Sequence, residues 1–120
     1  LNGDFERHAA YQTLSKFIAT ENQILFDAVF TGDDDAAIGV LKALHENNYR
    51  VPEDVSVIGF DDLEFSAFLN PPLTTVSAPT EAVGRTATEQ LFSLFDNQFP
   101  GDVTLLPTEL ITRHSCGCIT

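Results

Sequence analysis

The apolar positions of the chain recur with helical spacing in three stretches, and we expect a helix in each. Their apolar residues fall three or four positions apart, with charged residues between them, as in helices that bury one face. Pro79 suits the first turn of the third stretch, where its missing N–H costs nothing. The second stretch ends at two asparagines, which tolerate left-handed geometry. The three stretches are residues 6–20, 35–47 and 79–97.

Four short apolar segments predict strands. The segment at 55–60 is rich in β-branched residues, which suits a strand covered on both faces, and Gly59 is expected to let the chain turn at its end. A short helical turn is expected at 63–69. The order helix-strand-helix-strand-strand-helix-strand implies an α/β layer fold with at least one parallel crossover. The predicted strands are residues 24–30, 55–60, 73–76 and 103–112.

Two carboxylates follow the segment at 55–60 directly, and they are the first candidates for a binding site. In open parallel α/β sheets, ligands lie in the crevice at the carboxyl ends of the strands. The ionised side chain of Asp61 can accept two hydrogen bonds from neighbouring sugar hydroxyls, whereas Asp62 is better placed to cap the helical turn at 63–69. Phe60 is expected to belong to the core, because alternation along the strand turns it away from Asp61.

The composition is that of a globular domain with a strongly acidic surface. The chain has 120 residues, of which 43% are apolar, so it is one domain or part of one. Its 18 acidic and 6 basic residues give a net charge of −12, which argues against direct contact with nucleic acid or with anionic membranes. The sequence has no membrane span and no signal-peptide pattern. It begins with Leu1, and we expect the natural N-terminus to lie further upstream.

The residues indicate neither a metal site, a cofactor site nor a catalytic centre. Cys116 and Cys118 are the two cysteines. We expect free thiols in a reducing cytosol, since one intervening residue would strain a bridge between them. No histidine or further cysteine completes a metal site, and the sequence has neither a Gly-rich phosphate loop nor a nucleophile elbow. We therefore expect no catalytic residue, no bound metal and no cofactor.

Several short motifs stand in a fixed order along nearly the whole chain. They are GDF at 3–5, DAVFTGDD at 27–34 with AIG at 37–39, VPEDVSVIGFDD at 51–62, NPPLTTV at 70–76, GR at 84–85 and LPTEL at 106–110. In this order they resemble the effector-binding core of LacI/GalR-type transcription regulators. The resemblance implies a three-layer, parallel-sheet lobe of the periplasmic-binding-protein-like type I fold, present here in incomplete form.

In that family the sensor unit has two similar α/β lobes joined by three crossing strands, with the effector held between them. By resemblance, residues 1–70 and 103–115 would form the later part of the C-terminal lobe. Residues 73–97 would be one strand and one helix of the N-terminal lobe, and residues 116–120 a tail or a junction. Most of the N-terminal lobe and the DNA-binding headpiece would lie outside these residues.

The resemblance adds two residues to the candidate ligand site and assigns Asp61 to the family's ligand-contacting acid. Phe5 matches an aromatic residue that stacks on the effector; its structural alternative is a hydrophobic staple onto the first helix. Asp33 stands where many family members carry an effector-contacting Asn. An N-cap for the next helix is an equally good interpretation of Asp33, although Asp34 or Asp35 could cap instead. Since Asp lacks the amide donor of Asn, the identity of the ligand is not carried over.

We therefore expect a non-catalytic sensor of a small molecule, with a sugar or a nucleobase-like compound as effector. The resemblance implies a cytoplasmic homodimer that reaches DNA only through a missing N-terminal domain and makes no contact with a membrane. Two alternatives remain open. One is a sensor lobe fused to a C-terminal signalling enzyme, with residues 116–120 as the junction, and the other is a periplasmic sugar-binding protein of a transporter.

Overall fold

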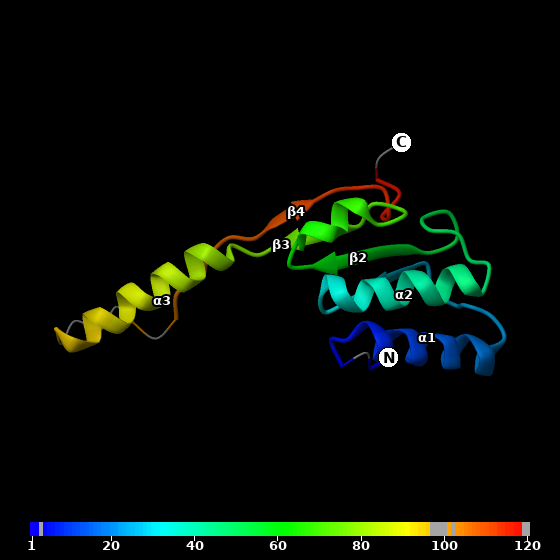
Figure 1. Cartoon of the computed structure of the whole chain (residues 1–120), viewed down its shortest axis with the longest axis horizontal. Coiled ribbons are helices and arrows are strands. Elements are labelled where there is room, and N and C mark those ends of the chain that lie inside the picture. Colours follow the sequence, from blue (N-terminus) through cyan, green and yellow to red (C-terminus); the bar gives the residue numbers. More distant parts are fainter. Residues whose placement is uncertain (3, 97–100, 102, 119–120) are drawn as a thin grey trace. The chain divides into compact units, whose positions relative to one another are not determined.

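The computed structural model describes residues 1–120 except 3, 97–100, 102 and 119–120, and the chain divides into two units (Figure 1). The larger unit comprises Leu1–Ser77 and Leu110–Thr120, and the smaller unit comprises Ala78–Glu109. The predicted order of helices and strands is confirmed. The elements are α1 (Arg7–Glu21), β1 (Ala28–Phe30), α2 (Asp34–Glu46), β2 (Ser56–Phe60), the 3-10 helix η1 (Glu64–Phe68), β3 (Thr74–Ser77), α3 (Thr80–Phe95) and β4 (Glu109–Ile111).

The strands form one sheet in the order β1-β2-β3-β4. β1 pairs in parallel with β2, and β2 pairs in parallel with β3, so the predicted α/β arrangement with parallel crossovers is confirmed. In the register, Phe30 lies opposite Ile58 and Phe60 lies opposite Val76. Since these three strands run in one direction, the segments that follow β1 and β2 emerge at the same edge of the sheet.

The core of the larger unit forms where α1 packs on α2 and α2 packs on β2 (Figure 1). The apolar faces expected for these two helices are buried, except that Phe17 of α1 and Ile38 of α2 are only half-buried. Gly39 permits the close approach of the two helices, because a Cβ atom there would overlap the carbonyl oxygen of Arg7. The core residues are Ala10, Leu14, Ile18, Ala36, Ala37, Val40, Leu41, Ala43, Leu44, Val55, Val57 and Leu73.

Two strands are shorter than predicted. β1 begins at Ala28 rather than at 24, and β4 covers Glu109–Ile111 rather than 103–112, part of which lies outside the described residues. β1 is an edge strand, and its Phe30 is 65% exposed, so an apolar run in the sequence did not become a buried strand. β2 alternates between buried and half-buried residues, so the expected full cover of both its faces is wrong for the described structure.

The smaller unit contains α3, which has no buried residue. Pro79 is its N-cap, and its predicted end at Asn97 lies outside the described residues. The strand predicted at 73–76 pairs with β2 in the larger unit, and the described residues of 103–109 belong to the smaller unit. The expected lobe boundaries stay a prediction. The assignment of α3 to an N-terminal lobe stays a prediction. No described helix has the length and apolarity needed to cross a lipid bilayer.

The segment after β4 packs on the sheet of the larger unit. Ser115 is fully buried; its carbonyl accepts a hydrogen bond from Val57 N at 2.8 Å, and its hydroxyl donates to Val57 O at 2.6 Å. The same hydroxyl accepts from Thr74 N at 2.8 Å, so Ser115 bridges β2 and β3 at the start of their paired register. The carbonyl of Cys116 accepts from Ser56 Oγ at 3.2 Å. The expected tail therefore begins as a packed segment.

Candidate ligand-binding site

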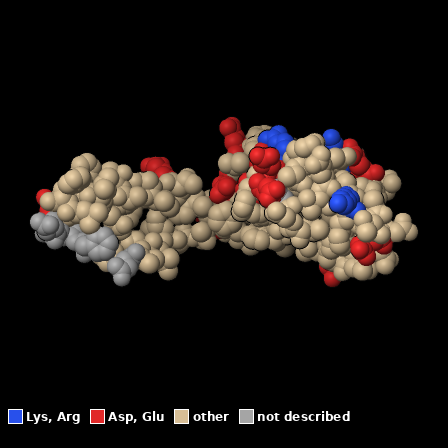
Figure 2. All heavy atoms as spheres, turned by 90° about the horizontal axis from the view of Figure 1, so that it is seen from below, with Lys and Arg blue, Asp and Glu red and all other residues tan. Residues whose placement is uncertain are grey.

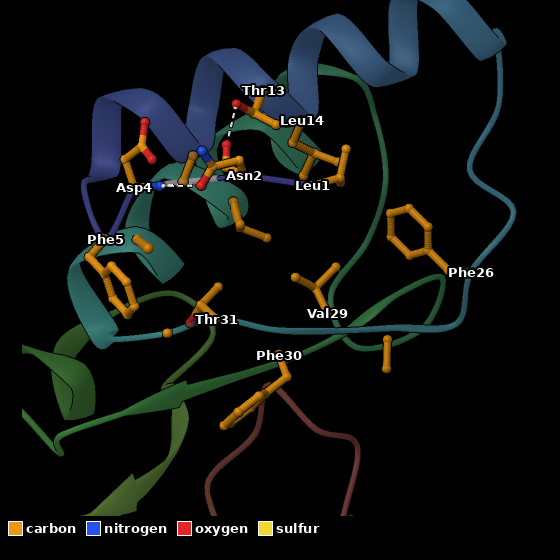
Figure 3. Close-up of a pocket in the computed structure, with 15 residues that line it drawn as sticks. Leu1, Asn2, Asp4, Phe5, Thr13, Leu14, Phe26, Val29, Phe30 and Thr31 are labelled. Carbon is orange, nitrogen blue, oxygen red and sulfur yellow. Dashed lines mark hydrogen bonds between the residues drawn. The ribbon is translucent and has the colours of Figure 1, made fainter.

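The three predicted site residues lie along the carboxyl edge of the sheet. Asp61 follows β2 directly, and Asp33 lies in the loop between the neighbouring β1 and α2. Phe5 comes from the segment before α1, and its ring lies against Gly32, where a Cβ atom would overlap it (Figure 3). Phe5 is 69% exposed, so its ring is accessible to a ligand, and the hydrophobic staple onto α1 stays an alternative.

A cavity of about 430 Å³ adjoins Phe5 beneath α1. This volume falls in the range of small-molecule pockets. Figure 3 shows Val29 pointing into this space, while Phe30 lies on the other side of β1. Its lining residues are Leu1, Asn2, Asp4, Phe5, Ala10, Thr13, Leu14, Phe26, Ala28, Val29, Phe30, Thr31, Gly32, Ala36 and Val40. The cavity thus borders the candidate site without including the carboxylates of Asp33 and Asp61.

Asp33 is the N-cap of α2. Its Oδ1 accepts a hydrogen bond from Ala36 N at 2.7 Å, which satisfies one of the free amides of the first turn. The N-cap role expected as one interpretation of Asp33 is therefore present. A contact of its second carboxylate oxygen with an effector stays a prediction. Asp35 does not cap; it binds Arg7, whose Nε donates to Oδ1 at 3.0 Å, and these hydrogen bonds lower the pKa of the Asp35 carboxyl.

Asp61 has a half-buried side chain whose carboxylate makes no hydrogen bond to any described residue. Its backbone has a φ of 99°, and that of Asp62 has a φ of 52°, so two consecutive residues adopt left-handed geometry without being glycine. Such strain is found where a side chain must be presented in one direction. The Asp61 carboxylate is thus held at the sheet edge and is free to accept hydrogen bonds from a ligand.

The structure contradicts the predicted helix-capping role of Asp62. No side chain caps η1, and Asp62 Oδ1 instead pairs with Arg113 Nη2 at 2.7 Å. Both side chains are largely buried, with exposed fractions of 25% for Asp62 and 20% for Arg113. The sequence offered little signal for this pair, because its two members are separated by 51 positions.

Asp34, rather than Asp62, holds the start of η1, although it does not cap the helix. Its side chain is fully buried; Oδ2 accepts from Leu63 N at 2.8 Å and from Ser66 Oγ at 2.6 Å, at the start of η1. Oδ1 accepts from Thr75 Oγ1 at 2.6 Å. Gly59 makes room for this carboxylate, since a Cβ atom there would overlap Oδ1. Because Gly59 lies inside β2, the turn expected at Gly59 is wrong. The buried carboxylate joins the start of α2, the start of η1 and β3.

The chain has many more acidic than basic side chains, with a net charge of −12. On the face seen in Figure 2, acidic side chains are spread over the larger unit, with few basic side chains among them. Within the described part of the chain, no three potential ligands gather into a metal site. The thiols of Cys116 and Cys118 are free. Burial opposes ionisation of Cys116, but the hydrogen bonds that its sulfur accepts from Cys118 and Thr74 outweigh burial and lower its pKa.

Comparison with known proteins finds a family whose model matches almost the whole chain. A family model described as a periplasmic binding protein-like domain matches residues 2–116. The chain is 40% identical over 119 residues to the HTH-type transcriptional repressor MelR of Bacillus subtilis, covering 98% of this chain and 34% of MelR. The chain spans about a third of the length of the curated relatives it matches.

Two solved structures show how closely the backbone agrees. A lac repressor dimer bound to operator and the anti-inducer ONPF has a TM-score of 0.88 and 32% identity, covering 95% of this chain and 34% of that one. A LacI family transcriptional regulator from Arthrobacter sp. FB24, in complex with lactose, has a TM-score of 0.79 and 34% identity, covering 93% of this chain and 42% of that one. The larger share of both proteins thus lies outside the matched region.

Proposed function

We propose that this chain, which belongs to the family of periplasmic binding protein-like domains, is the effector-sensing part of a LacI-type transcription regulator. The resemblance and the fold predicted from the sequence are confirmed by the family match. The observation that carries the proposal is identity to repressors over almost the whole chain, combined with a strand edge that presents Asp61 and Phe5. The relatives favour a regulator over a transporter protein or an enzyme-linked sensor.

The effector is proposed to be a sugar. The free carboxylate of Asp61 can accept hydrogen bonds from two hydroxyls, and the exposed ring of Phe5 can cover the C–H face of a pyranose. The similar Arthrobacter regulator was solved with lactose, which makes lactose the first compound to test. Binding between two lobes would shift a closure equilibrium, and that shift would alter DNA binding by another part of a homodimer in the cytoplasm.

The direct test is calorimetry on the full-length protein with lactose, cellobiose and ribose, beside an operator-release assay. Asp61→Asn should weaken binding of the responsive sugar by about 1.5–3 kcal/mol, the range for a charged hydrogen bond. Melting temperature should change little, because this carboxylate has no described partner to lose. Asp27→Asn, at an exposed residue just before β1, is the matched control and should leave affinity unchanged. Unchanged affinity with a lowered melting temperature would make Asp61 a structural residue.

Phe5→Ala and Asp33→Asn separate the roles of the other two candidates. Phe5→Ala should reduce affinity and leave stability nearly intact, because the ring is mostly exposed. Asp33→Asn keeps an oxygen that can cap α2, so any change in affinity would report the contact with the effector. If neither substitution affected sugar binding, the ligand would have to lie elsewhere, with the cavity beneath α1 as the next candidate.

A further inference from the structure

The turn at Asp61 and Asp62 is strained, and it needs support from outside. Two consecutive non-glycine residues with positive φ cost free energy that surrounding contacts must offset. Three hydrogen bonds flank the turn. Asp61 N donates to Val76 O at 2.8 Å, Asp62 N donates to Thr75 Oγ1 at 3.3 Å, and Leu63 N donates to Asp34 Oδ2 at 2.8 Å. These bonds fix the backbone of the turn.

Arg113 provides the tie to the Asp62 side chain. Its Nη2 donates to Asp62 Oδ1 at 2.7 Å, while Nη1 of the same guanidinium donates to Leu73 O at 2.8 Å. The backbone of Arg113 is fixed as well, since its N–H donates to Thr74 Oγ1 at 2.8 Å. A guanidinium with two anchored nitrogens and an exposed fraction of 20% has little freedom to move. It therefore holds Asp62, and through it the adjacent Asp61, against the start of β3.

The residues that hold the turn lie close in sequence to the two points where the chain passes between its two units. The chain leaves the larger unit after Ser77, one residue beyond Val76, and re-enters it at Leu110, three residues before Arg113. The turn that carries Asp61 is thus bonded to β3, which precedes the first connection, and to Arg113, which follows the second. A change in either connection has a short, hydrogen-bonded route to the orientation of the Asp61 carboxylate.

We propose that Arg113 is a positioning residue that orients Asp61 through its ion pair with Asp62 and couples the ligand site to the two connections between the units. The proposal rests on the proposed function, which gives Asp61 its ligand. Arg113 itself need not touch the effector. Its effect is local, because the pair joins a strand-end turn to the segment after β4 and lies outside the apolar core.

The test compares two Arg–Asp ion pairs in the full-length protein. Arg113→Gln should weaken lactose, cellobiose or ribose binding at least tenfold, and Asp62→Asn should do the same. The double substitution should be no worse than either single one, because both remove one interaction. Arg113→Lys should restore part of the affinity. Arg50→Gln, which breaks the Arg50–Asp54 pair of the same 2.7 Å length, should leave affinity unchanged.

Amide hydrogen exchange provides a measurement that needs no ligand. Arg113→Gln should speed exchange at Asp61 and Asp62 at least tenfold, whereas the amides of α2 should keep their protection. If Asp61→Asn weakens sugar binding but Arg113→Gln changes neither affinity nor exchange, the positioning role is wrong and the proposed function stands. If Arg113→Gln speeds exchange at the turn, but neither Arg113→Gln nor Asp61→Asn affects binding of any of the three sugars, the positioning of the turn stands. The assignment of a sugar to Asp61 then fails. Additive losses in the double variant would also overturn the proposal.

Discussion

The two units of the chain contain helices with similar patterns and very different surroundings. α2 of the larger unit has eight buried residues, whereas α3 of the smaller unit has none. Both helices repeat apolar residues with helical spacing, and α3 leaves Val83, Leu91 and Phe92 between 50% and 64% exposed. The contrast teaches that an amphipathic pattern specifies a face to be covered without specifying what covers it.

The glycines of the two helices differ in the same way. Gly39 of α2 lies where two helix backbones touch, and a Cβ atom there would meet the backbone of Arg7 and Tyr11. Gly84 of α3 has no neighbour within 4 Å of the position that a Cβ atom would take. One glycine is required by packing, and the other has no packing reason in the described structure.

The largest effect is expected from Asp34→Ala, which removes the buried carboxylate of the larger unit. It leaves two buried hydroxyls and one amide without an acceptor, and we expect a loss of about 3–5 kcal/mol in the free energy of unfolding. Urea denaturation measures it. Asp35→Ala is the control, since its ion pair with the exposed Arg7 should contribute about 0–1 kcal/mol. Equal small losses would mean that the buried network contributes little.

Gly39→Ala and Gly84→Ala test the contrast directly, because the two substitutions should have opposite signs. Gly39→Ala should destabilise the larger unit by about 1–3 kcal/mol, since the added methyl group must push two helix backbones apart. Gly84→Ala should leave stability unchanged or raise it by up to about 1 kcal/mol, the difference in helix propensity. Thermal unfolding followed by circular dichroism compares both. A destabilising Gly84→Ala would reveal a partner packed against α3.

The apolar face of α3 predicts self-association of a chain limited to these residues. Exposed Leu91 and Phe92 lie on a stripe that water disfavours, so sedimentation at micromolar concentration should find dimers or larger species. Replacing both residues by Gln should shift the chain toward monomer, with a stability change within about 0.5 kcal/mol. Leu25→Gln, at an exposed site of the larger unit, is the control and should leave association unchanged. A monomeric parent chain that binds no hydrophobic dye would contradict the prediction.

The smallest effect concerns acid stability and the pair of Arg50 with Asp54. Hydrogen bonds from Arg50 lower the pKa of Asp54 to about 2. Since an unfolded Asp titrates near about 3.9, the stabilisation is complete above that pH and is lost as the pH falls through about 2. Asp54→Asn should therefore lower the melting temperature slightly at pH 5, and the difference should shrink as the pH approaches 2. Glu53→Gln, next to the pair, should show no such convergence.

The sequence determined the order of the elements, the parallel α/β class and the family. Helical spacing, strand propensity and chain-breaking residues act over a few neighbouring positions, so they can be read without a fold. The same local logic placed Asp61 at the end of β2 and, with the family resemblance, Phe5 before α1. It also gave the N-cap role of Asp33 as one of two interpretations, and the structure has that cap.

Only the tertiary structure decided which carboxylate does what. Asp33, Asp34 and Asp35 are neighbours in sequence, yet one caps a helix, one is buried with three donors, and one binds Arg7. The partners of Asp34 and Asp35 come from β3, η1 and α1, tens of positions away, and no local pattern encodes such pairings. The Asp62–Arg113 pair and the length of β1 were missed for the same reason, because long-range partners decide which polar groups are paired and which strands have neighbours.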